Sequence, residues 1–392
     1  MGPPGLTSCT FPCVTGEMWT WVAVAVAVAF AVVGGYLLLT SREQTDEDEG
    51  GSRPARGSFR PEDEPPPKKR AAVIVNPTKF EDLDEVRDTL TKVCTKHDWQ
   101  APLLIETTAE DVGYGQTREA LEKKVDLVCA LGGDGTVRAV GEELVGSGIP
   151  FGLLPGGTGN LLARNLDLPV DDLGKAMTVA LTGRNRRIDA AWMSLDPEDP
   201  ALSLEEGAGE GSSTGTRRYA FFVMAGLGLD AAIMDSTDEQ LKKRIGWAAY
   251  VPSGFQHWLQ DRFKVTIACD EGEPDTQRAR MVVIGNCGRI TGGIDLMPDA
   301  EPDDGMLDVI VLAPRGVAAW AGVAARVVTR SDKTAPSLSR MKCAGATVEV
   351  HEPQRVQVDG DIIGEARRLR VEIEGRALIV RVGSAKHADA SA

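Results

Sequence analysis

The sequence lacks several features that would each identify a class of protein. Its seven cysteines are scattered and include no CxxC pair, so we expect buried or incidental thiols in a reducing compartment. No GxxxxGK[ST] segment occurs, so bound phosphates would be held without the lysine of a P-loop. No basic stretch is concentrated enough to follow a nucleic acid, and the formal net charge of -15 argues against such a partner. With 392 residues, the chain has room for two domains.

Residues 18–40 contain no charge and form an apolar run long enough to cross ~30 Å of hydrocarbon as a helix. Trp19, Trp21 and Tyr36 lie near its ends, where aromatic side chains suit the membrane interfaces. A cleaved signal peptide fits less well, because the run is too long and no Lys or Arg precedes it. Lys and Arg follow it, in a stretch rich in proline, glycine and charge, which puts the C-terminal part in the cytoplasm. We therefore predict a cell-membrane protein with a short extracytoplasmic N-terminus (1–17), a single transmembrane helix (18–40) and a disordered linker (41–70).

From residue 71 to about 187, short apolar runs alternate with segments whose apolar residues have helical spacing. The apolar runs at 71–75, 103–105, 127–131 and 149–154 predict strands. Strands separated by helices indicate βαβ units, and therefore an α/β domain with a parallel sheet. Ligands of such sheets bind at the carboxyl ends of the strands. Asn76, Thr107 and two glycine-rich turns fall at that edge.

The two glycine-rich turns each follow a predicted strand and precede a predicted helix. They are Gly132-Gly133-Asp134-Gly135-Thr136 and Gly156-Gly157-Thr158-Gly159-Asn160. Glycines at such a position let backbone N–H groups approach an anion, and Asp134 is suited to holding Mg²⁺ against it. The turns therefore predict a nucleotide phosphate site. The alternative is that the glycines only permit tight turns.

After about Arg187 the apolar residues alternate with a period of two, which predicts a mostly antiparallel β domain. We expect this domain at 188–368, followed by closing strands at 369–383 and a tail at 384–392. Within it, 196–216 is polar and rich in glycine and serine, so we expect a mobile insertion. The partly helical segment 238–263 carries aromatic residues that suit either a core or a lip in contact with the bilayer or an acyl chain.

Two acidic segments of the β domain have two interpretations each. Residues 301–308 crowd carboxylates around a turn, which suits Mg²⁺ or Ca²⁺ but also a solvated surface. Asp359 and Asp361 flank Gly360 at the end of a predicted strand. Asp-Gly is common in hairpin turns, whereas a carboxylate held near a substrate hydroxyl can accept its proton.

In their order along the chain, these motifs resemble the diacylglycerol kinase catalytic-domain family, which includes bacterial soluble lipid kinases and the sphingosine and ceramide kinases. The matching segments are NP (76–77), GGDGTV (132–137), LLPGGTGNLLAR (153–164), GLGLD (226–230), PDAEPDDGMLDV (298–309) and VDGD (358–361). The resemblance runs from about 71 to 382. The combination is specific, although NAD kinases and phosphofructokinases share turns related to GGDGT.

The resemblance implies a nucleotide domain like that of NAD kinases and diacylglycerol kinases, a C-terminal β-rich lipid domain, and ATP with Mg²⁺ in the cleft between them. The implied ATP-site residues are Asn76, Pro77, Thr78, Lys79, Phe80, Thr107, Gly132, Gly133, Asp134, Gly135, Thr136, Val137, Gly157, Thr158, Gly159 and Asn160. The implied metal-site residues are Glu301, Asp304 and Met306 at a structural Mg²⁺ turn, and Asp134 and Asp189 in an acidic network. Asp361 matches the family's proton acceptor and Asp134 would act through Mg²⁺, so both are candidate catalytic residues.

Six residues at four places in the chain depart from the pattern that the family often shows. Asp361 stands where a glutamate is common, which would place the base about one methylene further back. Lys79-Phe80 replaces Ser-Gly after Asn-Pro, and Leu161 replaces an acidic residue after GTGN. Arg138-Ala139 replaces Asn-Glu after GGDGTV, close to the residue that would organise the metal.

We therefore predict a membrane-tethered, ATP-dependent lipid kinase that transfers the γ-phosphate to a lipid hydroxyl in the bilayer, with diacylglycerol as the first candidate acceptor and phosphatidic acid as its product. Sphingosine, ceramide and glycolipids are alternative acceptors, for which the sequence has no distinguishing motif. A soluble-substrate kinase of the NAD-kinase type fits the apolar anchor and the C-terminal VDGD less well. A catalytically weak membrane scaffold that binds nucleotide or lipid is the alternative outside the enzymes. The sequence leaves the oligomeric state open, a homodimer included.

Overall fold

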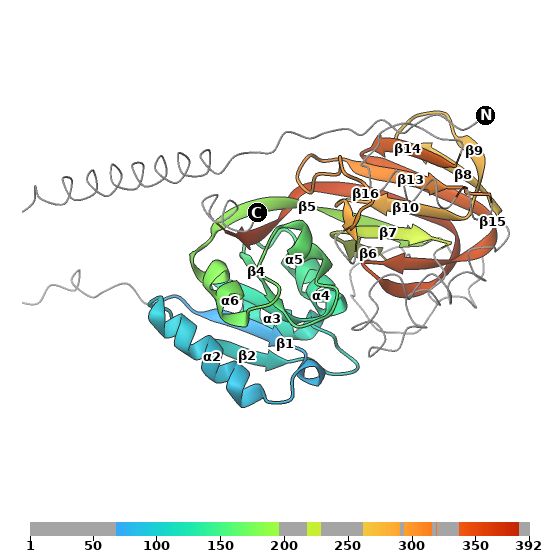
Figure 1. The fold of residues 1–392 in the computed structure, drawn as a ribbon. Coiled ribbons are helices and arrows are strands. Elements are labelled where there is room, and N and C mark those ends of the chain that lie inside the picture. The colour runs from blue at the N-terminus through green and yellow to red at the C-terminus, as the bar shows by residue number, and fades with distance from the viewer. Residues whose placement is uncertain are drawn as a thin grey trace, which may run out of the picture. The chain divides into compact units, whose positions relative to one another are not determined.

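The computed structural model describes residues 68–195, 218–228, 262–290, 294–315, 319 and 337–383 (Figure 1). The apolar run at 18–40, the insertion at 196–216 and the tail at 384–392 lie outside these residues, as do most of the linker and of the segment 238–263. Among the described residues, no helix is long and apolar enough to cross a membrane. The transmembrane helix therefore stays a prediction.

The N-terminal part of the described chain is a parallel sheet with helices on both faces. Its strands are β1 (Ala71–Val75), β2 (Leu103–Glu106), β3 (Leu127–Gly132) and β4 (Phe151–Pro155), in the spatial order β4-β3-β1-β2. Neighbouring strands in this set are parallel. Every residue of β1 and β3 is buried, as expected for strands that are covered on both faces. The predicted α/β part with a parallel sheet is confirmed.

The helices between these strands divide between the two faces of the sheet. α2 (Leu83–Lys96) and α6 (Leu173–Thr182) pack on one face, and α3 (Tyr114–Glu122) and α4 (Asp134–Leu144) pack on the other. Two shorter elements, the 3-10 helix η2 (Pro77–Lys79) and α5 (Leu161–Asn165), follow β1 and β4. In α2, Val86, Leu90 and Cys94 recur every four residues and are buried, and Asp82 caps the helix by accepting two backbone N–H groups.

The C-terminal part is built from antiparallel pairs. Its strands are β5 (Arg184–Leu195), β6 (Arg218–Phe221), β7 (Met224–Leu227), β8 (Phe263–Cys269), β9 (Asp275–Ala279), β10 (Met281–Gly285), β13 (Leu307–Leu312), β14 (Leu338–Cys343), β15 (Gly345–Val358) and β16 (Asp361–Val382), with a separate small pair of β11 (Arg289–Ile290) and β12 (Ile294–Asp295). The predicted antiparallel β part is therefore confirmed.

The two parts share one sheet. Near its end, β16 runs parallel to β4, with Val380 opposite Phe151. In the part of the chain that the structure describes, this pairing joins the parallel and antiparallel strands into a 14-stranded sheet. The expected domain boundary after residue 187 falls within β5. As a result, the carboxyl ends of β3 and β4 and the start of β16 belong to one continuous framework.

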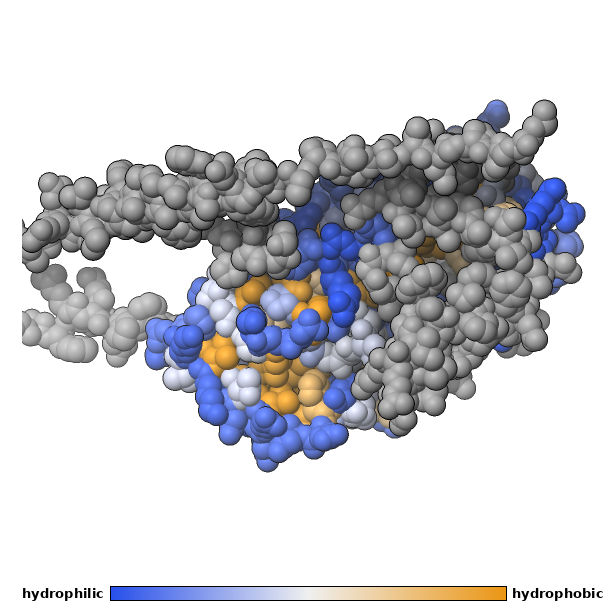
Figure 2. Space-filling model, viewed as in Figure 1, coloured by the Kyte–Doolittle hydropathy of each residue, from blue (hydrophilic) through white to orange (hydrophobic). Residues whose placement is uncertain are grey.

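Few large apolar side chains of the described residues are exposed. On the face drawn in Figure 2, apolar residues of the α/β part are bordered by hydrophilic ones. Among the described residues, the exposed large apolar side chains are Val112, at 37% exposure, and Ile362, at 53%. Ile362 is the second residue of β16 and follows the candidate catalytic residue Asp361.

Candidate active site

The first glycine turn connects β3 to α4, and its glycines have different surroundings. A Cβ atom at Gly132 would lie 2.7 Å from Thr136, whereas a Cβ atom at Gly133 would meet nothing within 4 Å. Gly133 is the N-cap of α4, and it makes no side-chain capping hydrogen bond. The first N–H groups of a helix lack partners within the helix and favour anions. The start of α4 thus combines open space with uncapped donors, which suits a phosphate group.

The second glycine turn, after β4, packs directly on the first. A Cβ atom at Gly156 would lie 2.6 Å from the backbone N of Gly132, and one at Gly157 would lie 2.8 Å from the Cα of Gly133. Asn160 closes this turn, because it is buried with a φ of 46° and its side-chain nitrogen donates to the carbonyl of Gly157 at 2.8 Å. The two turns therefore meet at one edge of the sheet, as their positions after parallel strands predicted.

Asn76 and Thr107 lie at the same edge. The backbone N of Asn76 donates to the carbonyl of Leu131 at 2.9 Å, next to the first turn. Asn76 Oδ1 accepts from the backbone N of Thr78 at 3.1 Å and from its hydroxyl at 2.8 Å. Thr107 is buried, and its backbone N donates to the carbonyl of Val75 at 2.9 Å. The structure thus brings these two residues to the edge that carries the glycine turns.

The remaining residues implied for the ATP site differ in exposure. Lys79 and Thr158 are exposed. Thr136 and Val137 are buried on α4, and Phe80 packs against the apolar cluster that includes α2 and α6. The side chains of Val137 and Phe80 therefore contribute to cores.

The hairpin between β15 and β16 carries two aspartates with different surroundings. Its two-residue loop, Asp359-Gly360, has positive φ angles of 46° and 95°, as type I′ turns require. The buried Asp359 carboxylate accepts the N–H groups of Phe222, Val223 and Met224 at 2.9–3.0 Å. Burial raises the pKa of Asp359 to about 6, against the opposing effect of these hydrogen bonds. Asp359 therefore anchors the hairpin.

Asp361, the first residue of β16, lies at the start of α4. A Cβ atom at Gly135 would be 2.9 Å from Asp361 Oδ2. Asp134, next to Gly135, accepts the N–H group of Leu161 through Oδ1 at 2.7 Å. Burial raises the pKa of Asp134, the hydrogen bond from Leu161 opposes this rise, and the charge of Asp361 adds to it. The structure therefore assembles the two candidate catalytic carboxylates at one helix start.

Arg138 also belongs to this site, although in the sequence it stands out only as a departure from the family pattern. It lies one turn after Asp134 on α4, with Nη2 at 3.3 Å from Asp361 Oδ2 and Nη1 donating to the Tyr114 hydroxyl at 3.3 Å. Burial raises the pKa of Tyr114 to about 12, so its hydroxyl stays protonated and donates to Glu142 Oε2 at 3.4 Å. The one signal in the sequence is the i, i+4 spacing of Arg138 and Glu142 on a helix whose other residues are largely buried.

In the acidic turn at 301–308, the Asp304 side chain is held by a lysine side chain and by a backbone N–H group. Asp304 Oδ2 lies 2.7 Å from Lys342 Nζ, and Asp304 Oδ1 accepts the N–H group of Met306 at 2.9 Å. Glu301 is exposed. Within the described ranges, no group of three His, Cys, Asp or Glu side chains is arranged to hold a metal ion. An ion at this turn would therefore depend on backbone oxygens as well as on these side chains.

Asp189 contacts the acidic turn at 301–308. Its buried carboxylate accepts the N–H group of Gly305 through Oδ2 at 2.7 Å and that of Arg376 through Oδ1 at 2.6 Å. Both oxygens thus hold backbone groups of the β part. The implied grouping of Asp189 with Asp134 in one acidic network stays a prediction.

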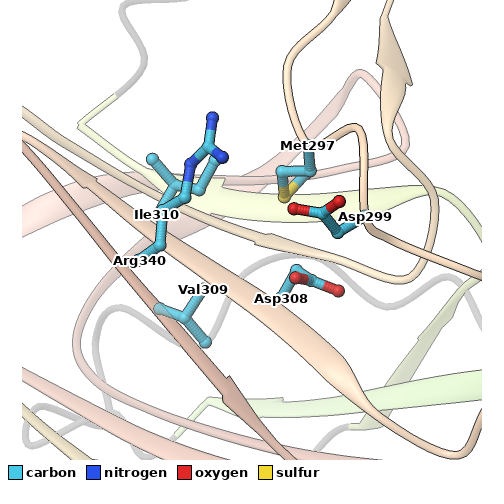
Figure 3. Close-up of a pocket in the computed structure, with 6 residues that line it drawn as sticks. All are labelled: Met297, Asp299, Asp308, Val309, Ile310 and Arg340. Carbon is cyan, nitrogen blue, oxygen red and sulfur yellow. The ribbon is translucent and has the colours of Figure 1, made fainter. Parts of the chain in front are cut away.

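A small recess lies beside the acidic turn, at β13 and β14 (Figure 3). Its lining residues are Met297, Asp299, Asp308, Val309, Ile310 and Arg340. Burial raises the pKa of Asp308, and the nearby Lys342 opposes this rise. None of the lining residues belongs to the glycine turns or to the β15–β16 hairpin, so this recess is distinct from the site at the start of α4.

Two family models match the chain over the parts that build this site. Residues 70–193 match the diacylglycerol kinase catalytic domain, which contains both glycine turns. Residues 223–382 match the YegS C-terminal NAD kinase beta sandwich-like domain, which contains the acidic turn and the β15–β16 hairpin. The order of the two matches is the order of the parallel and antiparallel parts of the sheet.

Similar proteins come from several bacteria. The chain is 30% identical over 292 residues to a protein of Pseudomonas aeruginosa named "Probable lipid kinase YegS-like", covering 71% of this chain and 84% of that protein. It is 28% identical over 307 residues to a diacylglycerol kinase of Staphylococcus saprophyticus, covering 76% of this chain and 90% of that protein. A crystal structure of a diacylglycerol kinase from Bacillus anthracis has the same fold, with a TM-score of 0.58 at 20% identity over 81% of this chain and 98% of that one.

Proposed function

The chain belongs to the diacylglycerol kinase catalytic-domain family and is an ATP-dependent lipid kinase, and from this premise we propose that it phosphorylates the free hydroxyl of diacylglycerol to give phosphatidic acid. The observation that carries the proposal is the meeting of Asp134, Asp361 and the two glycine turns at the start of α4. This arrangement offers donors for phosphate, one carboxylate for a metal and a second carboxylate for a proton. Phosphoryl transfer uses these three components.

In this proposal the phosphates of ATP bind the N–H groups at the first turn of α4, where Gly133 faces open space. Asn76 and Thr107 border the same edge of the sheet. When bound, Mg²⁺ supplies the positive charge that neutralises phosphate oxygens. Asp134 fits this ion, because its Oδ1 accepts the N–H group of Leu161 and fixes the carboxylate, while its Oδ2 lies beside Gly159.

Asp361 is the proposed proton acceptor. As the oxygen of the lipid hydroxyl attacks the γ-phosphorus, the new O–P bond forms, the bond to the β-phosphate oxygen breaks, and ADP leaves. The hydroxyl proton passes to the Asp361 carboxylate, which is nearly half exposed and can be reached by an acceptor from solvent or from a membrane surface. The buried Arg138 beside it fixes the carboxylate's position.

The apolar character of the acceptor is supported by Ile362. This side chain is 53% exposed and follows Asp361 directly in β16, so an acyl chain could contact it while the hydroxyl group meets the carboxylate. We further propose that the apolar run at 18–40 anchors the protein in the cell membrane, with the kinase on the cytoplasmic side beside its substrate.

The proposal is tested with the purified full chain in mixed micelles that contain labelled ATP, Mg²⁺ and one lipid at a time. The panel is diacylglycerol, sphingosine, ceramide and a glycolipid, with Asp134→Asn as the inactive control. We expect labelled phosphatidic acid as the main product and none from Asp134→Asn. If the main labelled product comes from another lipid of the panel, that lipid and not diacylglycerol is the acceptor. ATP binding with no transfer to any lipid would instead support a scaffold.

A further inference from the structure

The sulfur atoms of Cys269 and Cys343 lie 3.0 Å apart, although the residues are 74 positions apart in the sequence. Cys269 is the last residue of β8, and Cys343 is the last residue of β14. The sulfur atoms of a disulfide are about 2.05 Å apart. The two atoms would therefore have to approach by only about 1 Å to form a bond.

The backbone beside the two thiols is fixed by hydrogen bonds. Asp270 Oδ1 accepts the N–H groups of Ala344 at 3.0 Å and Gly345 at 2.9 Å. The backbone N of Asp270 donates to the carbonyl of Gly345 at 2.8 Å. The residues that follow each cysteine are therefore joined, and this holds the two thiols together without a bond between the sulfur atoms.

The two thiols differ in a way that suits sequential oxidation. Cys343 is fully buried, whereas Cys269 is partly exposed. The hydrogen bond from the Cys343 thiol lowers the pKa of Cys269, with burial opposing, and the same bond together with burial raises the pKa of Cys343. The thiolate is the form of cysteine that oxidants attack. Cys269 is therefore the thiol that reacts first, and Cys343 is positioned to react with its product.

The other cysteines of the described residues have a different environment. Cys94, Cys129 and Cys287 are buried, and burial raises the pKa of each thiol. Such thiols are protected and poorly nucleophilic. The expectation of buried, incidental thiols fits these three, whereas Cys269 and Cys343 form a pair.

We propose that Cys269 and Cys343 are an oxidation site that closes to a disulfide when the protein meets hydrogen peroxide. The Cys269 sulfur first takes one oxygen atom from the peroxide, which gives a sulfenic acid and releases water. The Cys343 sulfur then attacks the sulfenic sulfur, so that the S–S bond forms, the S–O bond breaks, and the hydroxyl group leaves as water with the thiol proton. The two thiols are oxidised by two electrons, and the peroxide is reduced by two. A dithiol reductant reverses the reaction.

The disulfide bond would join the ends of β8 and β14, and β14 also contacts the acidic turn. Lys342, next to Cys343, is the residue whose Nζ lies 2.7 Å from Asp304. The closed loop between the two cysteines contains the whole of 301–308. The oxidised protein should therefore be harder to unfold in this region, since a cross-link reduces the entropy of the unfolded chain.

The test is mass spectrometry of the full chain in a Cys9→Ser, Cys13→Ser background, so that the N-terminal thiols do not interfere. After treatment with hydrogen peroxide and digestion, we expect a peptide pair linked through Cys269 and Cys343 that dithiothreitol separates. The oxidised protein should also melt a few degrees higher than the reduced protein. Cys287→Ser is the matched control and should keep the link.

Two further measurements test whether Cys269 is oxidised first and whether the disulfide forms at all. Cys343→Ser should leave Cys269 as a sulfenic acid that dimedone labels. Recovery of both cysteines unlinked from peroxide-treated protein, whether unmodified or oxidised further, would overturn the proposal. This experiment does not use kinase activity, so its outcome is independent of the identity of the lipid acceptor.

Discussion

The guanidinium of Arg138 and the carboxylate of Asp361, 3.3 Å apart, join helix α4 to the β15–β16 hairpin. The Arg138 side chain is 10% exposed and the Asp361 side chain is 46% exposed, so the cation is buried behind a carboxylate that reaches solvent. Tyr114 and Glu142 continue the hydrogen-bonded chain behind Arg138. Since α4 also begins with Asp134, one helix positions both carboxylates of the proposed reaction.

Arg138→Met should lower kcat about ten- to hundredfold, because Asp361 loses the charged donor that orients it. The KM for ATP should change less, since Arg138 contacts the hairpin and not the glycine turns. Arg138→Lys should recover part of kcat, because an ammonium group keeps the charge but lacks the planar set of donors. Steady-state kinetics of lipid phosphorylation in micelles measure both parameters.

The matched control for this prediction is Arg118→Met. Arg118 lies on α3 and pairs with Glu143 at 2.8 Å, outside the group around Asp361. We expect the kcat of Arg118→Met to equal that of the wild type. A wild-type kcat in Arg138→Met would show that Asp361 works without this partner.

Asp361→Asn should lower activity with little effect on stability, whereas Asp359→Asn should lower stability. Asp361→Asn removes the proposed proton acceptor and should lower kcat about a hundredfold or more, with the free energy of unfolding changed by only ~0.5 kcal/mol. Asp359→Asn should lower the free energy of unfolding by about 1–3 kcal/mol, because an amide NH₂ group would face one of the three backbone donors. Urea unfolding and the lipid assay measure the two quantities. Full activity in Asp361→Asn would remove its proposed role.

The Arg186–Asp303 pair should stabilise the protein in a pH-dependent way. Arg186 donates two hydrogen bonds to Asp303, at 2.8 and 3.0 Å, and these hold the pKa of Asp303 below its ordinary value of 3.8. The Asp303 carboxylate therefore binds a proton less tightly in the folded protein than in the unfolded chain. The stabilisation is present above pH 3.8 and is lost as the pH falls through the lower folded value.

Asp303→Asn measures this contribution, which we expect to be roughly 1 kcal/mol for a pair that is partly exposed. The difference in unfolding free energy between the wild type and the variant should be largest near pH 7 and should shrink as the pH falls toward 3. A difference that stays constant over this range would show that the pair does not titrate as described.

Ile362→Ser should raise the KM for the lipid acceptor severalfold, because it removes apolar surface next to Asp361. The KM for ATP should be unchanged. Val112→Ser is the matched control, since Val112 is the other exposed large apolar side chain of the described residues. If both variants raise the KM for lipid equally, the effect reports general micelle affinity and not contact with the acceptor.

The glycine turns could be placed from the sequence because the geometry of a parallel sheet is simple. The carboxyl ends of neighbouring strands share an edge, so two turns after β3 and β4 had to meet there. The long antiparallel strands were harder to predict. The sequence predicts more than one closing strand at 369–383, but residues 369–382 belong to the single strand β16, with an irregularity between Glu374 and Leu378. Arg376, with a φ of 55°, marks that irregularity, which breaks the alternation of apolar residues without ending the strand.

The partners of charged side chains could not be found from local patterns. Arg138 and its partner Asp361 are 223 positions apart, and Lys342 of β14 contacts Asp304 in the acidic turn. Asp359 and Asp361 are nearly adjacent in a common hairpin motif, and only the position of the Phe222–Met224 backbone shows which of them is buried. Packing between distant segments of the chain decides these roles, and the spacing of apolar residues does not predict that packing.

Substituting single glycines should separate their structural role from their role in phosphate binding. Gly156→Ala would place a Cβ atom 2.6 Å from the backbone N of Gly132, and backbone cannot move aside easily, so we expect a loss of about 1–3 kcal/mol in unfolding free energy. Gly133→Ala meets nothing within 4 Å and has an ordinary φ of -82°, so the fold should be unaffected. The added methyl group would nevertheless occupy the space that phosphate is proposed to approach, and the KM for ATP should rise severalfold. An unchanged KM for ATP in a normally folded Gly133→Ala would mean that this glycine only permits the turn.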